Sequence, residues 1–153
     1  MDRIDRVILS ELQRDSRQPM TDIAARAGLS LSACHRRVKL LESAGMIEGY
    51  CAQLNASALG LEIEVFVEIS LNSQAQVALE QFEQAVVDDA EILECRLTSG
   101  ASDYIIRVVA RNVADYDRIH RDILARLPGV ASMRSLFTLR SIKAWRGLPI
   151  GVG

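Results

Sequence analysis

The hydrophobic pattern beyond residue 60 changes period in a fixed order, and this order constrains the fold more than any single motif. Apolar residues occupy every second position between Ile63 and Leu71, and the alternate positions from Glu62 to Ser70 are mostly acidic. This alternation predicts a strand with one buried face. Apolar residues then recur at helical spacing over residues 75–87. A strand is therefore followed directly by an amphipathic helix.

The same two periods return in the second half of this region. Two strand-like runs, ILECRLTS and YIIRVVA, flank a turn at residues 100–103, so they predict a hairpin. A second helical pattern starts at Val113 and stops at Pro128 and Gly129, and residues 130–144 are expected to form a last long strand. The order βαββαβ predicts a ferredoxin-like domain, in which a four-stranded antiparallel sheet carries both helices on one face.

The first 50 residues follow a different pattern, that of three short helices. Helical apolar spacing runs over residues 4–12, and Asp2 is placed to cap this first helix. Between Met20 and Lys39, two further helical patterns meet at Gly28, with Thr21 placed to cap the first of them. Two short helices joined by a tight turn are typical of a DNA-binding helix-turn-helix. The extended run EGYCAQL that follows predicts a modest wing.

The helix expected after Gly28 has one apolar and one basic side. Ser30 is placed to cap it, and its apolar stripe consists of Leu31, Cys34, Val38 and Leu41. A basic face suits the major groove of DNA, whereas the alternative is an ordinary surface helix with solvated charges. We expect base contacts from Ser32, His35 and Arg36, phosphate contacts from Arg37 or Lys39, and a backbone contact from Ser30.

The charge distribution fits a local rather than a general affinity for DNA. The chain of 153 residues has a formal net charge of −2, which is not typical of a protein that coats DNA. Residues 1–50 carry eight Lys or Arg against seven Asp or Glu, and residues 30–41 carry three basic residues, one histidine and no acid. Such a patch can contact phosphates, but it predicts weak non-specific binding and a need for avidity from an oligomer.

The sheet face that the helices leave open is expected to pair with a second copy of the chain. In a monomer, four apolar side chains would be exposed there: Phe66, Leu97, Val109 and Phe137. The alternative is a register shifted by one residue, which would move all four to the other face. A homodimer would bury these side chains and supply the twofold axis with which a helix-turn-helix reads two half-sites.

Several function classes find little support in the residues. Cys34, Cys51 and Cys95 have no metal-ligand spacing, and their odd number fits reduced core residues in the cytoplasm, so we expect neither a disulfide nor a metal. His120 and Cys95 lack the accompanying motifs of an enzyme, and we expect no catalytic residue and no cofactor. Without a membrane-length apolar run or a cleavable leader, the protein is expected to be soluble and not exported.

Several separated runs, in the right order, resemble the Lrp/AsnC family, the feast/famine transcriptional regulators. They are MDRIDRVILSELQRDSR, LSLSACHRRVKLLESAGMIEGYCAQLN, ALGLEIEVFVEISL, ILECRLTSGASDYIIRVV and RLPGVASMRSLFTLRSIK. The resemblance implies an α+β chain with a winged helix-turn-helix domain at residues 1–50, a linker at residues 51–62, and a ferredoxin-like RAM domain at residues 63–153. In this family the RAM domain typically binds an effector, and dimers assemble into octamers.

The resemblance also implies that an amino-acid effector binds at the hairpin turn, at contacts between neighbouring dimers. We call this segment the effector turn: Ser99, Gly100, Ala101, Ser102, Asp103 and Tyr104. The family's usual order of Gly, Asp, aromatic and Asp is Gly, Ala, Ser and Asp here, so one acid and the bulky ring are missing. N–H groups beside Gly100 can hold a carboxylate and Asp103 an ammonium, whereas the alternative makes Asp103 a simple turn residue. We expect a widened pocket or weak effector control.

Two functions remain open for the sequence alone. The first is a sequence-specific transcriptional regulator that an amino acid or related metabolite modulates. The second is an architectural DNA-binding protein without small-molecule control, which the altered effector turn favours. Weak sequence selectivity and the absence of a thermal shift with any amino acid would indicate the second function.

Overall fold

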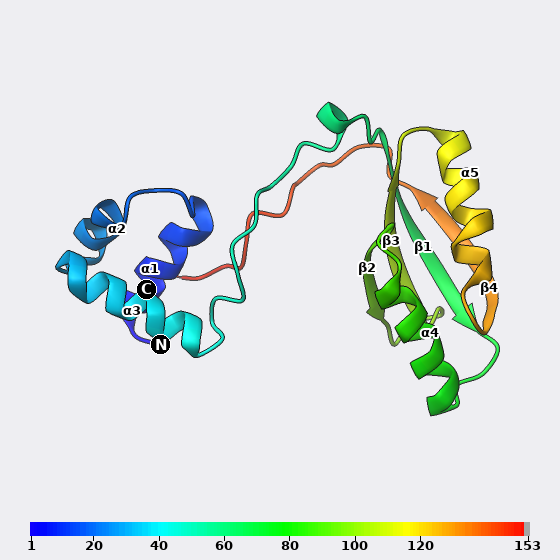
Figure 1. Cartoon of the computed structure of the whole chain (residues 1–153), viewed down its shortest axis with the longest axis horizontal. Helices are drawn as coiled ribbons and strands as arrows, with labels where there is room; N and C mark the ends of the chain where they lie inside the picture. The colour runs from blue at the N-terminus through cyan, green and yellow to red at the C-terminus, as the bar shows by residue number, and fades with distance from the viewer. Residues whose placement is uncertain (152–153) are drawn as a thin grey trace. The chain divides into compact units, whose positions relative to one another are not determined.

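The computed structural model describes residues 1–151, which fold into two compact units (Figure 1). The N-terminal unit comprises residues 1–53 and the described residues from 142 on, and the C-terminal unit comprises Leu54–Ser141. This differs from the C-terminal domain expected at residues 63–153, because the last described residues pack in the N-terminal unit, where Ile150 joins the apolar cluster. No helix within residues 1–151 is long and apolar enough to cross a membrane.

Three helices form the N-terminal unit: α1 (Arg3–Arg14), α2 (Met20–Ala27) and α3 (Leu31–Ser43). The side chains of Asp2 and Asp5 each accept the other residue's backbone N–H, so a capping box starts α1 at the residue expected. Gly28 ends α2 at φ +68°, a left-handed conformation that glycine adopts without strain. The buried residues of the three helices form one core: Ile8, Leu9, Ile23, Ala24, Cys34, Val38 and Leu41.

Three local predictions for this unit differ from the structure. Thr21 lies inside α2, which begins directly after Pro19, so its hydroxyl contacts the Asp22 carboxylate instead of capping the helix. Leu31 is 45% exposed because it lies in the first turn of α3, and the buried stripe starts at Cys34. The run EGYCAQL is not a strand, since no backbone hydrogen bond within residues 1–151 pairs it with another segment.

The C-terminal unit has the predicted order of elements: β1 (Ile63–Leu71), α4 (Gln76–Asp88), β2 (Ile92–Leu97), β3 (Tyr104–Ala110), α5 (Val113–Asp122) and β4 (Val130–Phe137). The strands form one antiparallel sheet in the order β2-β3-β1-β4, and both helices cover the same face (Figure 1). Alternate residues of β1 and β3 are buried against Phe82 of α4 and Tyr116 of α5. The predicted α+β class and ferredoxin-like topology are therefore confirmed.

The last strand, β4, is shorter than expected. It pairs with β1 from Val130 to Phe137, and Thr138 donates one further hydrogen bond from its N–H to the carbonyl of Glu64 at 2.9 Å. Beyond this bond, residues 138–151 contain no helix or strand. The prediction of a strand over residues 130–144 is wrong at its C-terminal end.

Two of the four residues expected on the open face lie on the helix-covered side of the sheet. Phe137 pairs with Val65, and Leu97 pairs with Tyr104, and both partners are buried under the helices. The cause is a register shift in each edge strand, where one extra residue reverses the alternation that follows it. The Phe137 ring accordingly contacts Tyr116 of α5, with 5.0 Å between the ring centroids.

The open face of the sheet mixes apolar and paired charged side chains. Phe66 and Val109 lie on it as predicted, and the register adds Ile105 and Leu136, with Leu136 directly opposite Phe66. Ion pairs cover much of the remaining surface, three of them between neighbouring strands and one, Arg96 with Glu94, within β2; the others are Arg107 with Glu64 and Glu94, and Arg134 with Glu68. The face therefore has an apolar centre between compensated charges.

Candidate functional site

The apolar side of α3 holds this helix in the N-terminal unit. Cys34 is fully buried, with its Sγ 3.5 Å from the Sδ of Met20 in α2. Burial raises the pKa of the Cys34 thiol, which keeps it neutral as a core residue. Ser30 begins α3 as predicted, because its hydroxyl oxygen accepts the N–H of Ala33 at 3.3 Å. The opposite side of α3 thus faces outward.

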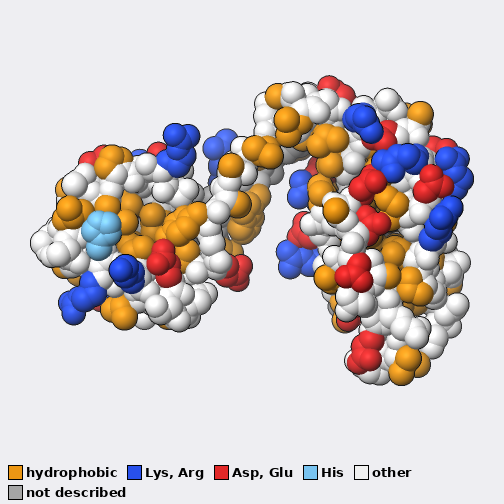
Figure 2. Space-filling model, viewed as in Figure 1, with side chains coloured by type: hydrophobic (Ala, Val, Ile, Leu, Met, Phe, Trp, Pro, Cys, Tyr) orange, Lys and Arg blue, Asp and Glu red, His pale blue; other side chains and the backbone are white. Residues whose placement is uncertain are grey.

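This outward side carries four exposed residues, which we call the α3 face: Ser32, His35, Arg36 and Lys39. Offsets of three, four and seven residues place them on one side of a helix. Within residues 1–151 no hydrogen bond or ion pair involves the side chains of His35, Arg36 and Lys39, while the hydroxyl of Ser32 contacts that of Ser30 at 3.2 Å. Basic side chains and a histidine project from this unit (Figure 2). The face can therefore bind acceptor groups of a partner.

Arg37 does not belong to this face. Its Nη1 donates to Asp2 Oδ2 at 2.5 Å and to Asp5 Oδ1 at 2.7 Å, the two carboxylates of the α1 capping box. These hydrogen bonds raise the pKa of Arg37, while the Asp5 backbone N–H and the Arg37 guanidinium lower the pKa of Asp2. The charge of Arg37 is compensated within the unit, so this residue fixes α3 to α1 and is not placed for the phosphate contact predicted from the sequence.

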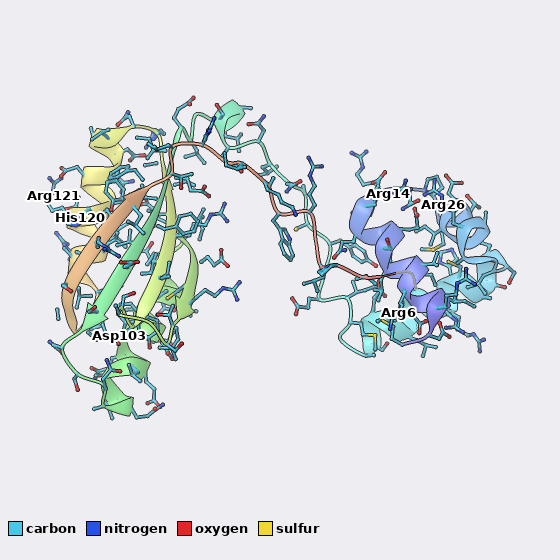
Figure 3. The ribbon with its side chains drawn as sticks, turned by 180° about the vertical axis from the view of Figure 1, so that it is seen from behind. Arg6, Arg14, Arg26, Asp103, His120 and Arg121 are labelled. Carbon is cyan, nitrogen blue, oxygen red and sulfur yellow. The ribbon has the colours of Figure 1, made fainter. Side chains whose placement is uncertain are left out.

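The effector turn joins β2 to β3 at one end of the sheet, where Asp103 is labelled in Figure 3. Thr98 closes the turn from within, because its N–H donates to the Asp103 carbonyl at 2.8 Å and its hydroxyl donates to the Ser102 carbonyl at 2.6 Å. Residues 99–101 are exposed, and the N–H groups of residues 99–102 have no acceptor within residues 1–151. A loop tip with several unpaired N–H groups can bind a carboxylate.

Asp103 connects the effector turn to the segment between β1 and α4. Its Oδ2 accepts the N–H of Leu71 at 2.7 Å, and its Oδ1 accepts a hydrogen bond from Gln74 Nε2 at 2.8 Å. Its own N–H donates to the carbonyl of Ile69 at 2.9 Å. Both carboxylate oxygens thus have a protein partner, although each keeps a further lone pair for a ligand. Asp103 holds the turn in place whether or not it also binds an ammonium.

Tyr104, at the end of the effector turn, lies in the core and is only 1% exposed. Its ring centroid is 4.5 Å from that of Phe82, and its hydroxyl donates to Glu83 Oε1 at 2.7 Å. Burial, followed by this hydrogen bond, raises the pKa of Tyr104, and burial together with the Glu83 charge raises the pKa of Cys95 to about 11. Tyr104 therefore anchors the effector turn to the core, and its buried side chain is not accessible to a ligand.

Sequence reasoning missed the residues that hold Asp103 and Arg37 in place. Leu71 and Gln74 are 32 and 29 positions from Asp103, and Asp5 is 32 positions from Arg37. No local spacing connects residues so far apart. The fold creates these contacts. It brings the end of β1 beside the β2–β3 turn, and the start of α1 beside α3.

Two surface hollows of the described chain lie away from these residues. Two hollows of about 500 and 460 Å³ are lined by residues 14–26 and by residues 77–88. Neither includes a residue of the effector turn or of the α3 face. Among residues 1–151, no group of three His, Cys, Asp or Glu side chains is arranged to hold a metal ion. At the effector turn itself, residues 99–101 are exposed.

Comparisons with known proteins match both units. The family model described as winged helix-turn-helix DNA-binding matches residues 1–48, and the model described as Lrp/AsnC ligand binding domain matches residues 64–148. The leucine-responsive regulatory proteins of Escherichia coli (strain K12) and Klebsiella pneumoniae are each 42% identical to this chain over 143 residues. The match covers 94% of this chain and 87% of each relative.

Solved structures agree with the sequence relatives. A transcriptional regulator from Neisseria meningitidis, solved as an L-Met complex, has a TM-score of 0.92 and 31% identity, covering 98% of this chain and 97% of that chain. An AsnC family regulator from Agrobacterium tumefaciens has a TM-score of 0.92 and 34% identity, with the same coverage. The sequence matches and the fold confirm the predicted resemblance: this chain belongs to the Lrp/AsnC family of transcriptional regulators, with an N-terminal DNA-binding domain and a C-terminal ligand-binding domain.

Proposed function

We propose that this regulator reads a specific duplex site through the α3 face and responds to an amino acid bound at the effector turn. The observation that carries the proposal is the contrast between two neighbouring arginines. Arg37 is bound to two carboxylates, whereas Arg36 has no partner within residues 1–151. Unsatisfied donors on a helix face without an acid favour binding to the acceptors of DNA.

The residues of the α3 face suit different parts of the DNA. The planar guanidinium of Arg36 matches two acceptors of a guanine edge, and His35 and Ser32 offer short donors and acceptors beside it. Lys39, a point charge on a flexible stem, suits a phosphate. The hydroxyl of Ser30 already caps α3, so its contact with the DNA backbone is secondary. Sequence reading thus depends mainly on Arg36 and His35.

The chemistry of the effector turn suits an α-amino acid. The unpaired N–H groups of residues 99–102 can hold its carboxylate, and the free lone pairs of Asp103 can accept from its ammonium. The L-Met complex of the Neisseria regulator supports this class of ligand. Because Ala101 and Ser102 are small, the side chain of the ligand has more room than in members with an aromatic residue at this position. A neighbouring copy would enclose it.

The open face of the sheet is the proposed dimer interface. Its apolar centre, formed by Phe66, Ile105, Val109 and Leu136, is only partly covered in one chain. Packing the same face of a second copy against it would bury these side chains and keep the ion pairs at the rim. Further assembly of dimers into octamers would bring effector turns of different dimers together, as the family resemblance implies.

The DNA-reading part of the proposal is tested by selecting duplexes from a randomised pool with the full-length protein. We expect an enriched motif with twofold symmetry, because a symmetric dimer presents two α3 faces. An architectural protein, the alternative that the altered effector turn favours, would enrich no motif.

The ligand part is tested by the thermal stability of the protein with each of the twenty amino acids. A ligand at a hundred times its dissociation constant stabilises the folded state by about 2.7 kcal/mol. We expect at least one amino acid to raise the melting temperature of the wild type and not that of the Asp103→Asn variant. Stabilisation by none of the twenty would contradict effector control and favour the architectural alternative.

A further inference from the structure

The segment that follows β4 returns to the N-terminal unit and binds α1. The carboxamide of Gln13 forms two hydrogen bonds with the backbone of one residue, because its Nε2 donates to the Leu148 carbonyl at 2.8 Å and its Oε1 accepts the Leu148 N–H at 2.7 Å. Only Asn and Gln side chains can donate and accept in this way. Gln13 thus binds the chain end as a neighbouring strand would.

Contacts on both sides of Leu148 complete this docking. Ile150 packs against the apolar cluster of the N-terminal unit, and Arg6 Nη1 donates to the carbonyl of Gly151 at 3.1 Å. Arg6 and Gln13 are seven residues apart, so they lie on one side of α1. Figure 3 labels Arg6 on this helix. The segment therefore lies along the helix rather than touching it at one point.

Gly147 lies close against Gln13 of α1. Its φ of +103° is unfavourable for any other residue, and a Cβ at this position would overlap the side chain of Gln13. A larger residue would have to move either Gln13 or the chain end, and both movements break the pair of hydrogen bonds. A glycine is thus required for the docking.

We propose that α1 carries a docking site for residues 147–151 of its own chain, and that this docking gives the DNA-binding unit a second attachment to the sheet. Undocked, the unit is joined to β1 only through residues 44–62, which reach at most about 70 Å when fully extended. Docked, it is also joined to β4 through residues 138–146, which limit the distance from Phe137 to Gly147 to about 35 Å. The shorter connection restricts where α1 can lie.

The same helix also holds the recognition helix. At its N-terminus, Asp2 and Asp5 bind Arg37 of α3, and on another part of its surface Gln13 binds Leu148. The second attachment therefore acts on α3 through α1. This inference rests on the proposed function in one respect: in a dimer that reads two half-sites, a restricted α1 would restrict the permitted distance between the half-sites.

The docking itself is tested by hydrogen exchange at the Leu148 amide in the full-length protein. Gln13→Ala removes both hydrogen bonds without weakening α1, because alanine favours helices at least as well as glutamine. Gly147→Ala breaks the same contact from the other partner and leaves α1 unchanged. We expect exchange at Leu148 to become about tenfold faster in both variants, and to be unchanged in Gln81→Ala, an equivalent substitution at an exposed position of α4. Unchanged exchange in the two variants would overturn the docking.

The attachment is tested with duplexes that carry two copies of the half-site selected by the wild type, at separations that increase by one base pair over a helical turn. We expect the wild type to lose about tenfold in affinity when the half-sites face opposite sides of the duplex, and the Gln13→Ala and Gly147→Ala variants to lose about threefold or less. Equal losses in wild type and variants would overturn the second attachment. A wild type that selects no half-site would refute the proposed function, while the Leu148 exchange would still decide the docking.

Discussion

Replacing Asp103 separates the structural role of this residue from its proposed role in binding the effector. In the structure its carboxylate accepts the N–H of Leu71 and the amide of Gln74, and Leu71 itself is only 8% exposed. Asp103→Ala leaves the Leu71 N–H without an acceptor at the end of β1. Asp103→Asn keeps one side-chain carbonyl for this N–H but removes the negative charge that an ammonium requires.

The expected magnitudes follow from the hydrogen bonds lost. The bond from the Leu71 N–H to a charged acceptor contributes about 2 kcal/mol, and the exposed bond from Gln74 contributes little. Asp103→Ala should therefore lower the free energy of unfolding by about 2 kcal/mol, and Asp103→Asn by about half as much. For a unit of this size, 1 kcal/mol corresponds to roughly 4–8 °C in melting temperature.

The assay is a thermal melt of wild type and both variants, each with and without the amino acid that stabilises the wild type. We expect Asp103→Ala to melt roughly 10 °C below the wild type and Asp103→Asn roughly 5 °C below it, and neither to be stabilised further by the ligand. If Asp103→Ala melted at the wild-type temperature, its hydrogen bonds to the β1–α4 segment would be irrelevant to stability. If Asp103→Asn kept the full ligand response, Asp103 would not bind the ammonium.

Three further predictions concern separate parts of the molecule. Ser30→Ala, which removes the cap of α3, should lower the stability of the N-terminal unit by about 1 kcal/mol in urea denaturation, with the exposed Ser16→Ala as control. Phe66→Glu, which puts a charge at the centre of the open face, should shift the protein toward monomers in sedimentation experiments, and an unchanged mass would reject this face as the interface. Hydrogen bonds from the Arg111 backbone and from Arg118 lower the pKa of Asp115 to about 2, below its ordinary value, so its contribution to stability is present above about pH 4 and lost as the pH falls toward 2. Melting temperatures at pH 5 and pH 2.5 should differ less in Arg118→Gln than in wild type.

Strict alternation and capping patterns account for the parts of the fold that the sequence predicts well. The alternation from Ile63 to Leu71 matches the bounds and the buried face of β1, and Asp2 and Ser30 begin their helices as expected. The two caps depend on hydrogen bonds that span three residues, and the buried face of β1 is marked by its own alternation. Local patterns therefore contain the information that the local structure needs.

The predictions that differ from the structure depend on distant partners. A register shift in β2 reverses the side on which Leu97 lies, and β4 ends where its pairing with β1 ends, at Phe137. Arg36 and Arg37 are neighbours of the same residue type, yet only Arg37 meets two carboxylates from the start of α1. Helical spacing places Arg37 beside the buried stripe of α3, but only the contacts show that it meets these two carboxylates.

The measurement that tests the central claim most directly compares the affinities of wild type and Arg36→Ala for the selected duplex and for a scrambled duplex of equal length, at one salt concentration. A bidentate contact with one base is worth about 1–3 kcal/mol of discrimination. Arg36→Ala should therefore reduce the ratio of the dissociation constant for the scrambled duplex to that for the selected duplex about tenfold. Arg121→Ala, which removes an exposed arginine of α5 (Figure 3), should leave both constants unchanged. If Arg36→Ala weakened binding to both duplexes equally, Arg36 would contact only phosphate, and sequence reading by the α3 face would be contradicted.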